Sequence, residues 1–293
     1  MNKVILVSPA KINLFLKVIQ RRRDGYHNIL SWMQAVDLSD QLEIERITGG
    51  IKIHSNSRAI PVGKLNLIYS AAESYLVEAG ISGGVKIKLT KNIPMAAGLG
   101  GGSSNAAFTL LGMNRLFGNK LNREKLLKLA RKLGSDVPFF LTSGSALASG
   151  RGEKLTELKL PLNYRLVLVN PGFEVKTKWA YQNVKPKRVN KKFARQRSHV
   201  NLNGLIRETE SLGNDLAGAV IDRHKIIGKI IVDLKRAGAL YSAMTGSGPT
   251  VFGIFKTRAA AQKAASELKR QPKWKVWHCR PVRLTKKLIQ PTA

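Results

Sequence analysis

The order of apolar and polar positions predicts a strand near the start of the chain. Between positions 11 and 18, the odd positions carry Lys, Asn, Phe and Lys, whereas the even positions carry Ile, Leu, Leu and Val. A period of two is typical of a strand that buries one face and exposes the other. We therefore expect residues 3–18 to form a half-buried strand, with Lys11 on its polar face.

The rest of the chain predicts a mixture of strands and helices. The pair Asp24-Gly25 favours a turn. We expect strands within residues 41–47, 49–55, 84–93, 144–158, 164–171, 239–255 and 274–282. We expect helices within residues 66–80, 105–118, 122–133, 219–238 and 257–270. Because strands and helices do not alternate cleanly, the pattern favours an α+β fold over a single doubly wound parallel sheet.

The pattern of apolar and polar residues changes near residue 160. There a continuous apolar strand is followed by a basic and weakly patterned segment. We expect an N-terminal domain of residues 1–158 and a C-terminal domain of residues 159–293. A chain of 293 residues is long enough for two modest domains, each with its own core. The pattern leaves both a monomer and a homodimer open.

Composition limits the compartment and the kind of site. Lys11 and Asn13 interrupt the apolar N-terminal stretch and no cleavage pattern follows, so we expect a mature strand there and not a signal peptide. No apolar run is long enough to span a bilayer, and we expect no membrane partner. Cys279 is the only cysteine, which excludes an intrachain disulfide and a thiolate-rich metal site and favours the cytoplasm.

The chain is strongly basic. Fifty Lys and Arg against eighteen Asp and Glu give a formal net charge of +32, and such a field attracts polyanions. A nucleic-acid partner therefore has to be weighed. The charge is diffuse, however, and its densest block, residues 183–199 with its centre at 185–197, has no zinc-finger or RNP-like aromatic pattern. We expect a generally basic surface that steers anionic substrates, and no main role in binding nucleic acid.

The segment PMAAGLGGGSSNAA, residues 94–107, carries the strongest candidate chemistry. A P-loop is excluded because neither Gly-Lys pair of the chain is followed by Ser or Thr. A dinucleotide fingerprint is excluded because its acidic residue would fall in an expected helix. Consecutive glycines that lead from a strand into a helix suit an anion held on backbone N–H groups. Ser103 and Ser104 are placed to cap that helix or to bind phosphate or Mg²⁺.

A second glycine cluster, Met244–Gly253, by itself fits an ordinary hairpin. Together with PAKINL (residues 9–14) and the glycine run, it resembles in order and spacing the three motifs of the GHMP kinases. RRRDGYHNI, NLIYSAA, LGSDVPFFL, SGRGE and GND add a narrower resemblance. Within the superfamily, the chain is similar to the 4-diphosphocytidyl-2-C-methyl-D-erythritol kinases over nearly its whole length.

The resemblance implies a two-domain GHMP kinase fold with the active site in the cleft between the domains. It implies ATP-dependent phosphorylation of the 2-hydroxyl of a cytidine-diphosphate-linked methylerythritol, in the non-mevalonate route to isoprenoid precursors, with ATP and Mg²⁺ as cofactors. Two alternatives stay open at this point. One is a GHMP-type kinase for another small alcohol, and the other is a basic nucleic-acid-binding protein.

The resemblance also implies a catalytic pair. From the residues alone, Lys11 fits a solvated side chain on the alternating strand, and Asp136 fits a helix N-cap. In the family, the lysine of PAKINL and the aspartate of DVPFF act together, which favours a catalytic role for both residues. Phosphoryl transfer needs positioning and charge stabilisation more than covalent help. A carboxylate can orient or deprotonate the attacking hydroxyl, and an ammonium beside it stabilises charge at the reacting oxygens.

Binding residues follow from the same resemblance. Tyr26 and Tyr181 are expected to hold the cytosine ring between them, and His27 to recognise its edge. Asn13 is expected to contact the hydroxyls of the sugar alcohol, and Thr177 to lie in the same pocket. The residues expected to bind ATP are Asn66, Lys91, Pro94, Met95, Ala96, Ala97, Gly98, Leu99, Gly100, Gly101, Gly102, Ser103, Ser104 and Asn105, with Ser104 also a candidate Mg²⁺ contact. The loop departs from the family pattern at Ala96 and Ala97, where many relatives have a further glycine.

Overall fold

The computed structural model describes residues 2–61, 63–184, 200–285 and 289–291. Its strands form a seven-stranded and a four-stranded sheet. All but the first two residues of the basic block at 183–199 lie outside the described residues.

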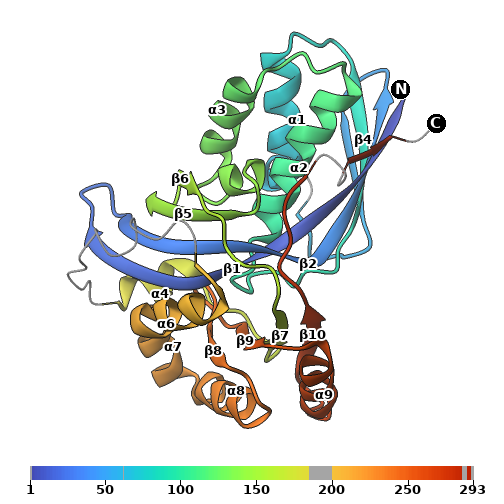
Figure 1. The fold of residues 1–293 in the computed structure, drawn as a ribbon. Coiled ribbons are helices and arrows are strands. Elements are labelled where there is room, and N and C mark those ends of the chain that lie inside the picture. Colours follow the sequence, from blue (N-terminus) through green and yellow to red (C-terminus); the bar gives the residue numbers. More distant parts are fainter. Residues whose placement is uncertain (1, 62, 185–199, 286–288, 292–293) are drawn as a thin grey trace.

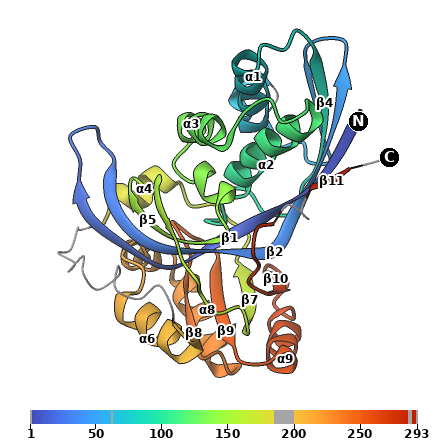
Figure 2. The ribbon, with the colours of Figure 1, turned by 45° about the horizontal axis from the view of Figure 1, so that its top comes forward.

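The first sheet has the strand order β11-β1-β2-β4-β3, and β5 joins it through β2 and carries β6. Its strands are β1 (Lys3–Arg21), β2 (His27–Ile47), β3 (Ile51–Ser55), β4 (Gly84–Thr90), β5 (Ser145–Gly150), β6 (Lys154–Glu157) and β11 (Ile289–Pro291). The associated helices are η1 (Gly63–Leu65), α1 (Leu67–Glu78), α2 (Gly101–Leu116), α3 (Arg123–Leu133) and η2 (Val137–Leu141). Figures 1 and 2 show α1, α2 and α3 on one face of this sheet, where their apolar side chains share a core with it.

The second sheet has the order β10-β7-β9-β8 and is antiparallel throughout. Its strands are β7 (Arg165–Asn170), β8 (Tyr241–Met244), β9 (Val251–Phe255) and β10 (Lys275–Cys279). The helices around it are α4 (Thr177–Gln182), α6 (Leu202–Leu212), α7 (Ala217–Arg223), α8 (Lys225–Arg236) and α9 (Arg258–Leu268). This half of the molecule lies across β1 and β2 from α1, α2 and α3 (Figure 1). Among the helices of the described ranges, none is long and apolar enough to cross a bilayer.

The prediction that the first strand is half buried was wrong. The polar-face residues Lys11, Asn13 and Phe15 are 4%, 2% and 0% exposed, as deeply buried as their apolar neighbours. The reason is a second layer that the local pattern does not reveal. Phe15 belongs to a core cluster that also contains Leu166 and Phe252 of the second sheet. The middle of β1 is therefore covered on both faces, and its lysine lies inside the protein.

Two elements have different bounds from those expected. The strand predicted at residues 41–47 is the last third of β2, which begins at His27 and pairs with β1 along most of its length. The helix predicted at residues 219–238 is divided into α7 and α8. His224 interrupts it with φ −130° and ψ 77°, and the His224 ring stacks on Phe173 at a centroid distance of 4.6 Å. A stretch with one continuous apolar period thus forms two helices.

The end of the chain returns to the first sheet. Beyond β10, the backbone N–H of Val282 donates to Ala35 O at 2.9 Å, and that of Leu284 donates to Ser143 O at 2.9 Å. β11 then pairs antiparallel with Val4–Leu6 of β1. The strand expected at residues 274–282 is therefore not the last one. A domain boundary near residue 158 stays a prediction.

Gly84 at the start of β4 gives a test of the sheet. A Cβ at this position would lie 2.2 Å from Gly50 O, so Gly84→Ala should lower the free energy of unfolding by about 2–3 kcal/mol. At the neighbouring Gly83, a Cβ would meet nothing closer than 3.8 Å, and Gly83→Ala should change stability by less than about 0.5 kcal/mol. Urea unfolding of both variants measures the difference, and equal stabilities would contradict the close approach of Gly50 O to Gly84.

Candidate active site

Almost all the predicted site residues gather around one cavity of about 1410 Å³. Its wall is formed by β1, the tip of the β1–β2 hairpin, the start of α1, the glycine run, the start of η2, α4 and the turn between β8 and β9. Ser104 is the exception. Its side chain is fully buried, and its Oγ lies 2.8 Å from Ser8 Oγ, behind the cavity wall. The fold thus brings together, around one cavity, site residues that lie far apart in the sequence.

Lys11 and Asp136 form an ion pair at the cavity. Lys11 Nζ lies 3.3 Å from Asp136 Oδ2 and donates a hydrogen bond to Asn13 Oδ1 at 2.6 Å. The lysine is 4% exposed, whereas the aspartate side chain is 34% exposed. Asp136 stands at the N-cap position of η2 but makes no capping hydrogen bond with its side chain. Its carboxylate therefore remains available to a group in the cavity.

Asn13 is held in place by three elements. Its Nδ2 donates to Ser31 Oγ on β2 at 2.8 Å, and that hydroxyl donates to Phe15 O at 2.6 Å. Its backbone N–H donates to Thr245 Oγ1 in the β8–β9 turn at 2.8 Å. The side-chain amide thus orients the Lys11 ammonium, and the backbone N–H ties β1 to the β8–β9 turn of the second sheet.

The two glycine clusters touch each other. Gly98 has φ +75°, and a Cβ there would lie 2.4 Å from Thr245 O. At Gly246 a Cβ would lie 3.0 Å from Gly98 O. Backbone can approach backbone this closely only where side chains are missing. The glycines of both segments are therefore needed to join the halves of the molecule beside the cavity.

Gly100 makes room for the side chain of Lys11. It has φ +67° and is the N-cap of α2, and a Cβ there would lie 3.0 Å from Lys11 Cε. The backbone N–H of Lys11 donates to Leu99 O at 2.9 Å, which fixes the loop against β1. Ala96 also has a positive φ, +47°, where a Cβ costs about 1–2 kcal/mol. This is one of the two positions at which the loop departs from the family pattern.

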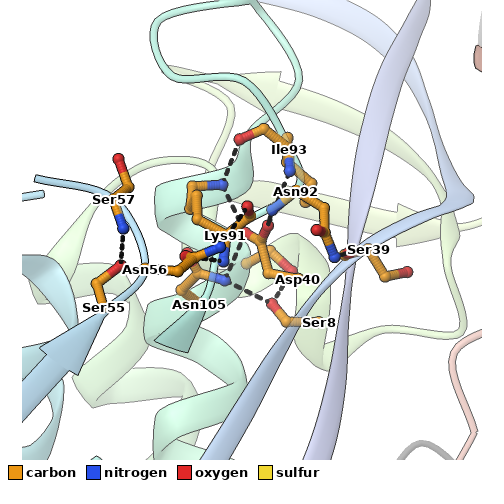
Figure 3. Close-up of polar contacts among 11 residues, drawn as sticks. Ser8, Ser39, Asp40, Ser55, Asn56, Ser57, Lys91, Asn92, Ile93 and Asn105 are labelled. Atoms are coloured by element: carbon orange, nitrogen blue, oxygen red, sulfur yellow. Dashed lines mark hydrogen bonds and ion pairs between the residues drawn. The ribbon is translucent and has the colours of Figure 1, made fainter. Parts of the chain in front are cut away.

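A buried carboxylate, Asp40, supports the glycine run from behind (Figure 3). Its Oδ1 accepts the backbone N–H groups of Asn92 and Ile93 at 2.7 and 2.8 Å. Its Oδ2 accepts Lys91 Nζ at 2.6 Å and Asn105 Nδ2 at 3.0 Å. Burial lowers the pKa of Lys91, and the charge of Asp40 opposes that shift. The sequence analysis missed Asp40, because no motif surrounds it and its partners are more than fifty residues away.

The predicted substrate residues of the β1–β2 hairpin and of α4 also line the cavity. His27 and Tyr181 stack with ring centroids 5.4 Å apart and an interplanar angle of 27°. This is direct ring contact, so no base fits between these two rings. Tyr26 is 55% exposed at the hairpin tip, and Thr177 Oγ1 lies 3.0 Å from Ser247 Oγ. Burial, with a smaller contribution from Arg21, lowers the pKa of His27, so this ring is neutral at pH 7.

Asn66 and the GND segment have structural partners. Asn66 caps α1 by accepting the N–H of Ile68 at 2.9 Å, and it also lines the cavity. Asn214 donates from Nδ2 to Met244 O at 2.8 Å and to Gly246 O at 2.9 Å, which holds the second glycine cluster. Asp215 pairs with Lys17 of β1. The resemblance contained GND, but no role for it could be assigned without these contacts.

Comparisons with known proteins identify the family of this chain. The family description "GHMP kinases N terminal domain" matches residues 66–144, and "GHMP kinases C terminal" matches residues 191–273. A 4-diphosphocytidyl-2-C-methyl-D-erythritol kinase from Geobacter sulfurreducens is 41% identical over 94% of this chain and 97% of its own length. The chain belongs to the 4-diphosphocytidyl-2-C-methyl-D-erythritol kinase family of the GHMP kinases. An enzyme of the same name from Clostridium novyi is 40% identical over 87% of this chain and 91% of its own.

Solved structures of GHMP kinases have the same fold. A crystal structure of 4-(cytidine 5'-diphospho)-2C-methyl-D-erythritol kinase superposes with a TM-score of 0.81 at 35% identity, and covers 95% of this chain and 99% of its own. A homoserine kinase from Cytophaga hutchinsonii, at 21% identity, has a TM-score of 0.72 over 99% of this chain and 97% of its own. The α+β architecture expected from the sequence is thus confirmed as the GHMP kinase fold.

The contact between the glycine clusters of this GHMP kinase can be tested by substitution. Gly98→Ala should lower the free energy of unfolding by about 3 kcal/mol, because the methyl group overlaps Thr245 O at a positive φ. The matched control is Gly102→Ala in the first turn of α2, where the nearest atom to a Cβ is 3.9 Å away. It should change stability by less than about 1 kcal/mol. Chemical denaturation of both variants is the measurement, and similar losses would contradict the contact.

The contribution of the buried Asp40–Lys91 ion pair to stability can also be tested. Asp40→Ala leaves the Lys91 ammonium buried without its carboxylate, and should cost about 3–5 kcal/mol of unfolding free energy. Asp37→Ala removes an ion pair with Arg280 that is largely exposed, and should cost at most about 1 kcal/mol. Thermal unfolding of the two variants separates these cases. A small effect at Asp40 would show that the loop is held by other contacts.

Proposed function

We propose that this chain transfers the γ-phosphoryl group of ATP to the 2-hydroxyl of 4-diphosphocytidyl-2-C-methyl-D-erythritol, a step in the non-mevalonate route to isoprenoid precursors. The observation that carries the proposal is the Lys11–Asp136 pair at the cavity, between the glycine run and the aromatic residues of the hairpin and α4. The names of the relatives and of the 35% identical solved structure support the same substrate.

The start of α2 supports ATP as the donor. The first N–H groups of a helix have no partner within it and carry a partial positive charge. At α2 these groups belong to the glycine run, and Gly100 supplies no side chain to cap them. They are thus available to phosphate oxygens at a wall of the cavity. The remaining residues predicted to bind ATP line the same wall, apart from Ser104.

In the proposed reaction, Asp136 acts on the acceptor alcohol. Its carboxylate accepts the hydroxyl proton as the oxygen forms its bond to the γ-phosphorus, and the bond from that phosphorus to the β-phosphate oxygen breaks to release ADP. The Lys11 ammonium, 3.3 Å from the carboxylate, stabilises negative charge at the oxygens between which the phosphoryl group moves. Asn13 keeps the ammonium in that position.

Mg²⁺ is part of the proposal. The described residues contain no group of three or more His, Cys, Asp or Glu side chains able to hold a metal ion. The Asp136 carboxylate at the cavity still suits Mg²⁺, because this ion is commonly bound by one or two carboxylates together with substrate phosphates and water. Asp136 and the Ser103 hydroxyl at the cavity wall are the residues that would hold it. The ion would neutralise charge on the phosphates.

A cytoplasmic location, supported by the single cysteine, stays a prediction.

The aromatic residues favour a cytidine-linked substrate over another small alcohol. A small alcohol needs no aromatic wall, whereas Tyr26, His27 and Tyr181 line one side of this cavity. A neutral His27 can donate or accept a hydrogen bond at a base edge. Nucleic-acid binding as the main role is not favoured by the family match or by the relatives described above, which are kinases.

Turnover measures this proposal directly. Wild-type protein should release ADP with 4-diphosphocytidyl-2-C-methyl-D-erythritol in a coupled assay, and Asp136→Ala should reduce kcat by at least about 100-fold. ATP binding by the variant, measured by calorimetry in the absence of Mg²⁺, should stay near the wild-type value. Ser135→Ala, a neighbouring change at the same wall, should retain activity within a few-fold. No turnover by folded protein, or equal turnover with homoserine or mevalonate, contradicts the proposal.

A further inference from the structure

Each acidic side chain of the cavity wall has a basic partner that compensates its charge. Two carboxylates line the cavity, and both have a basic partner. Asp136 Oδ2 lies 3.3 Å from Lys11 Nζ, and Asp24 Oδ2 lies 3.0 Å from Arg22 Nη2. The charges of these two pairs cancel over the length of the cavity, so neither pair supplies a net positive charge to an anionic ligand.

Basic side chains exceed the acidic ones at the same wall. Lys91 is balanced by the buried Asp40, at 2.6 Å. Arg21, Arg151 and Lys178 also line the cavity, and none of them forms an ion pair within the ranges that the structure describes. Arg151 lies close enough to Asp24 for its charge to help lower the pKa of that carboxyl, but Asp24 already pairs with Arg22. The wall therefore carries more positive than negative charge. A concave wall of this kind concentrates the field at an anionic ligand.

These three cations lie beside the aromatic residues of the wall. The Arg151 guanidinium lies over the Tyr26 ring, with Cζ 5.0 Å from the ring centroid. Arg21 is the register partner of His27 in the β1–β2 pair, and its charge contributes to lowering the pKa of His27. Both side chains therefore lie at the hairpin tip, where the base of a nucleotide substrate is expected.

Lys178 supplies the third charge from another element. It lies three residues before Tyr181 on α4, a spacing that puts both side chains on one face of the helix. Tyr181 stacks on His27, which joins this face to the hairpin. The cations thus come from β1, from the β5–β6 turn and from α4, and each is next to one ring of the aromatic wall.

We propose that Arg21, Arg151 and Lys178 form a subsite for the diphosphate of the cytidine-linked substrate. This inference rests on the proposed function, and it adds the residues that distinguish a nucleoside diphosphate from a nucleoside. A base among the aromatic rings places its phosphates a ribose length away, within reach of long basic side chains. Arginine binds phosphate oxygens through two N–H groups at once, and lysine as a mobile point charge.

The subsite is separate from the site proposed for the phosphates of ATP. Those phosphates are assigned to backbone N–H groups at the start of α2, which carries no unpaired basic side chain at the cavity wall. The two anion sites use different chemistry and come from different elements of the cavity wall. A substitution among the three cations should therefore change binding of the cytidine substrate and leave ATP binding unchanged.

Calorimetry with CDP and with cytidine tests the subsite without any turnover. Wild-type protein should bind CDP at least about 30-fold more tightly than cytidine, and the difference should shrink as salt rises. Arg151→Ala and Lys178→Ala should each weaken CDP binding about 5- to 10-fold, with a smaller effect on cytidine. Lys178→Arg should retain most of the CDP affinity. Lys263→Ala, which removes one charge from the exposed side of α9, is the matched control and should change neither affinity.

Steady-state kinetics separates this inference from the proposed function. The Arg151→Ala and Lys178→Ala variants should raise KM for the cytidyl substrate about 5- to 10-fold, with kcat and KM for ATP within about twofold of wild type. An unchanged ratio of CDP to cytidine affinity in folded variants overturns the subsite. A wild-type preference for CDP that these substitutions abolish, without turnover of the cytidyl substrate, overturns the proposed function and leaves the subsite in place.

Discussion

The candidate site depends on one close backbone contact between the two glycine clusters. Gly98 lies against Thr245 O, and Gly246 lies against Gly98 O, so the loop before α2 and the turn between β8 and β9 support each other. Asn214 holds the second of these segments through two backbone carbonyls. Lys11 is bonded to the first through Leu99 O. The cavity has this form because two sheets meet at backbone that carries no side chains.

Burial of charge is the second constraint on the molecule. Three lysines of this basic protein lie inside it or nearly so, at positions 11, 17 and 91, and each faces an aspartate. Removing a charge from water costs several kcal/mol unless a partner compensates it closely. Such pairs add little net stability, but they tolerate only one arrangement of the strands that carry them. They therefore fix the position of β1 relative to the glycine run and to the second sheet.

The sequence predicted those elements whose formation depends on residues close together in the chain. Helices with caps at Asn66 and Asn122 were predicted within two residues of their bounds, because capping and apolar period act within a few residues. The burial of Lys11 could not be predicted, since the residues that lie against its side chain, Gly100 and Asp136, are more than eighty residues away in the chain. Motif resemblance found the cavity residues that sit in motifs. It could not find Asp40. It also assigned no role to the cations of the aromatic wall, although RRRDGYHNI and SGRGE contain two of them, because these roles depend on contacts between distant segments.

The short strand β11 has a consequence for how the protein is made. It pairs with Val4–Leu6 of β1, so the first and last described strands lie side by side, as Figure 1 shows near the labels N and C. Among the described strands, β1 is synthesised first and its neighbour on this edge is synthesised last. This edge of the first sheet therefore stays open until the chain has been made as far as β11. A chain that stops at β10 would keep every residue of the cavity wall and still expose that edge to other chains.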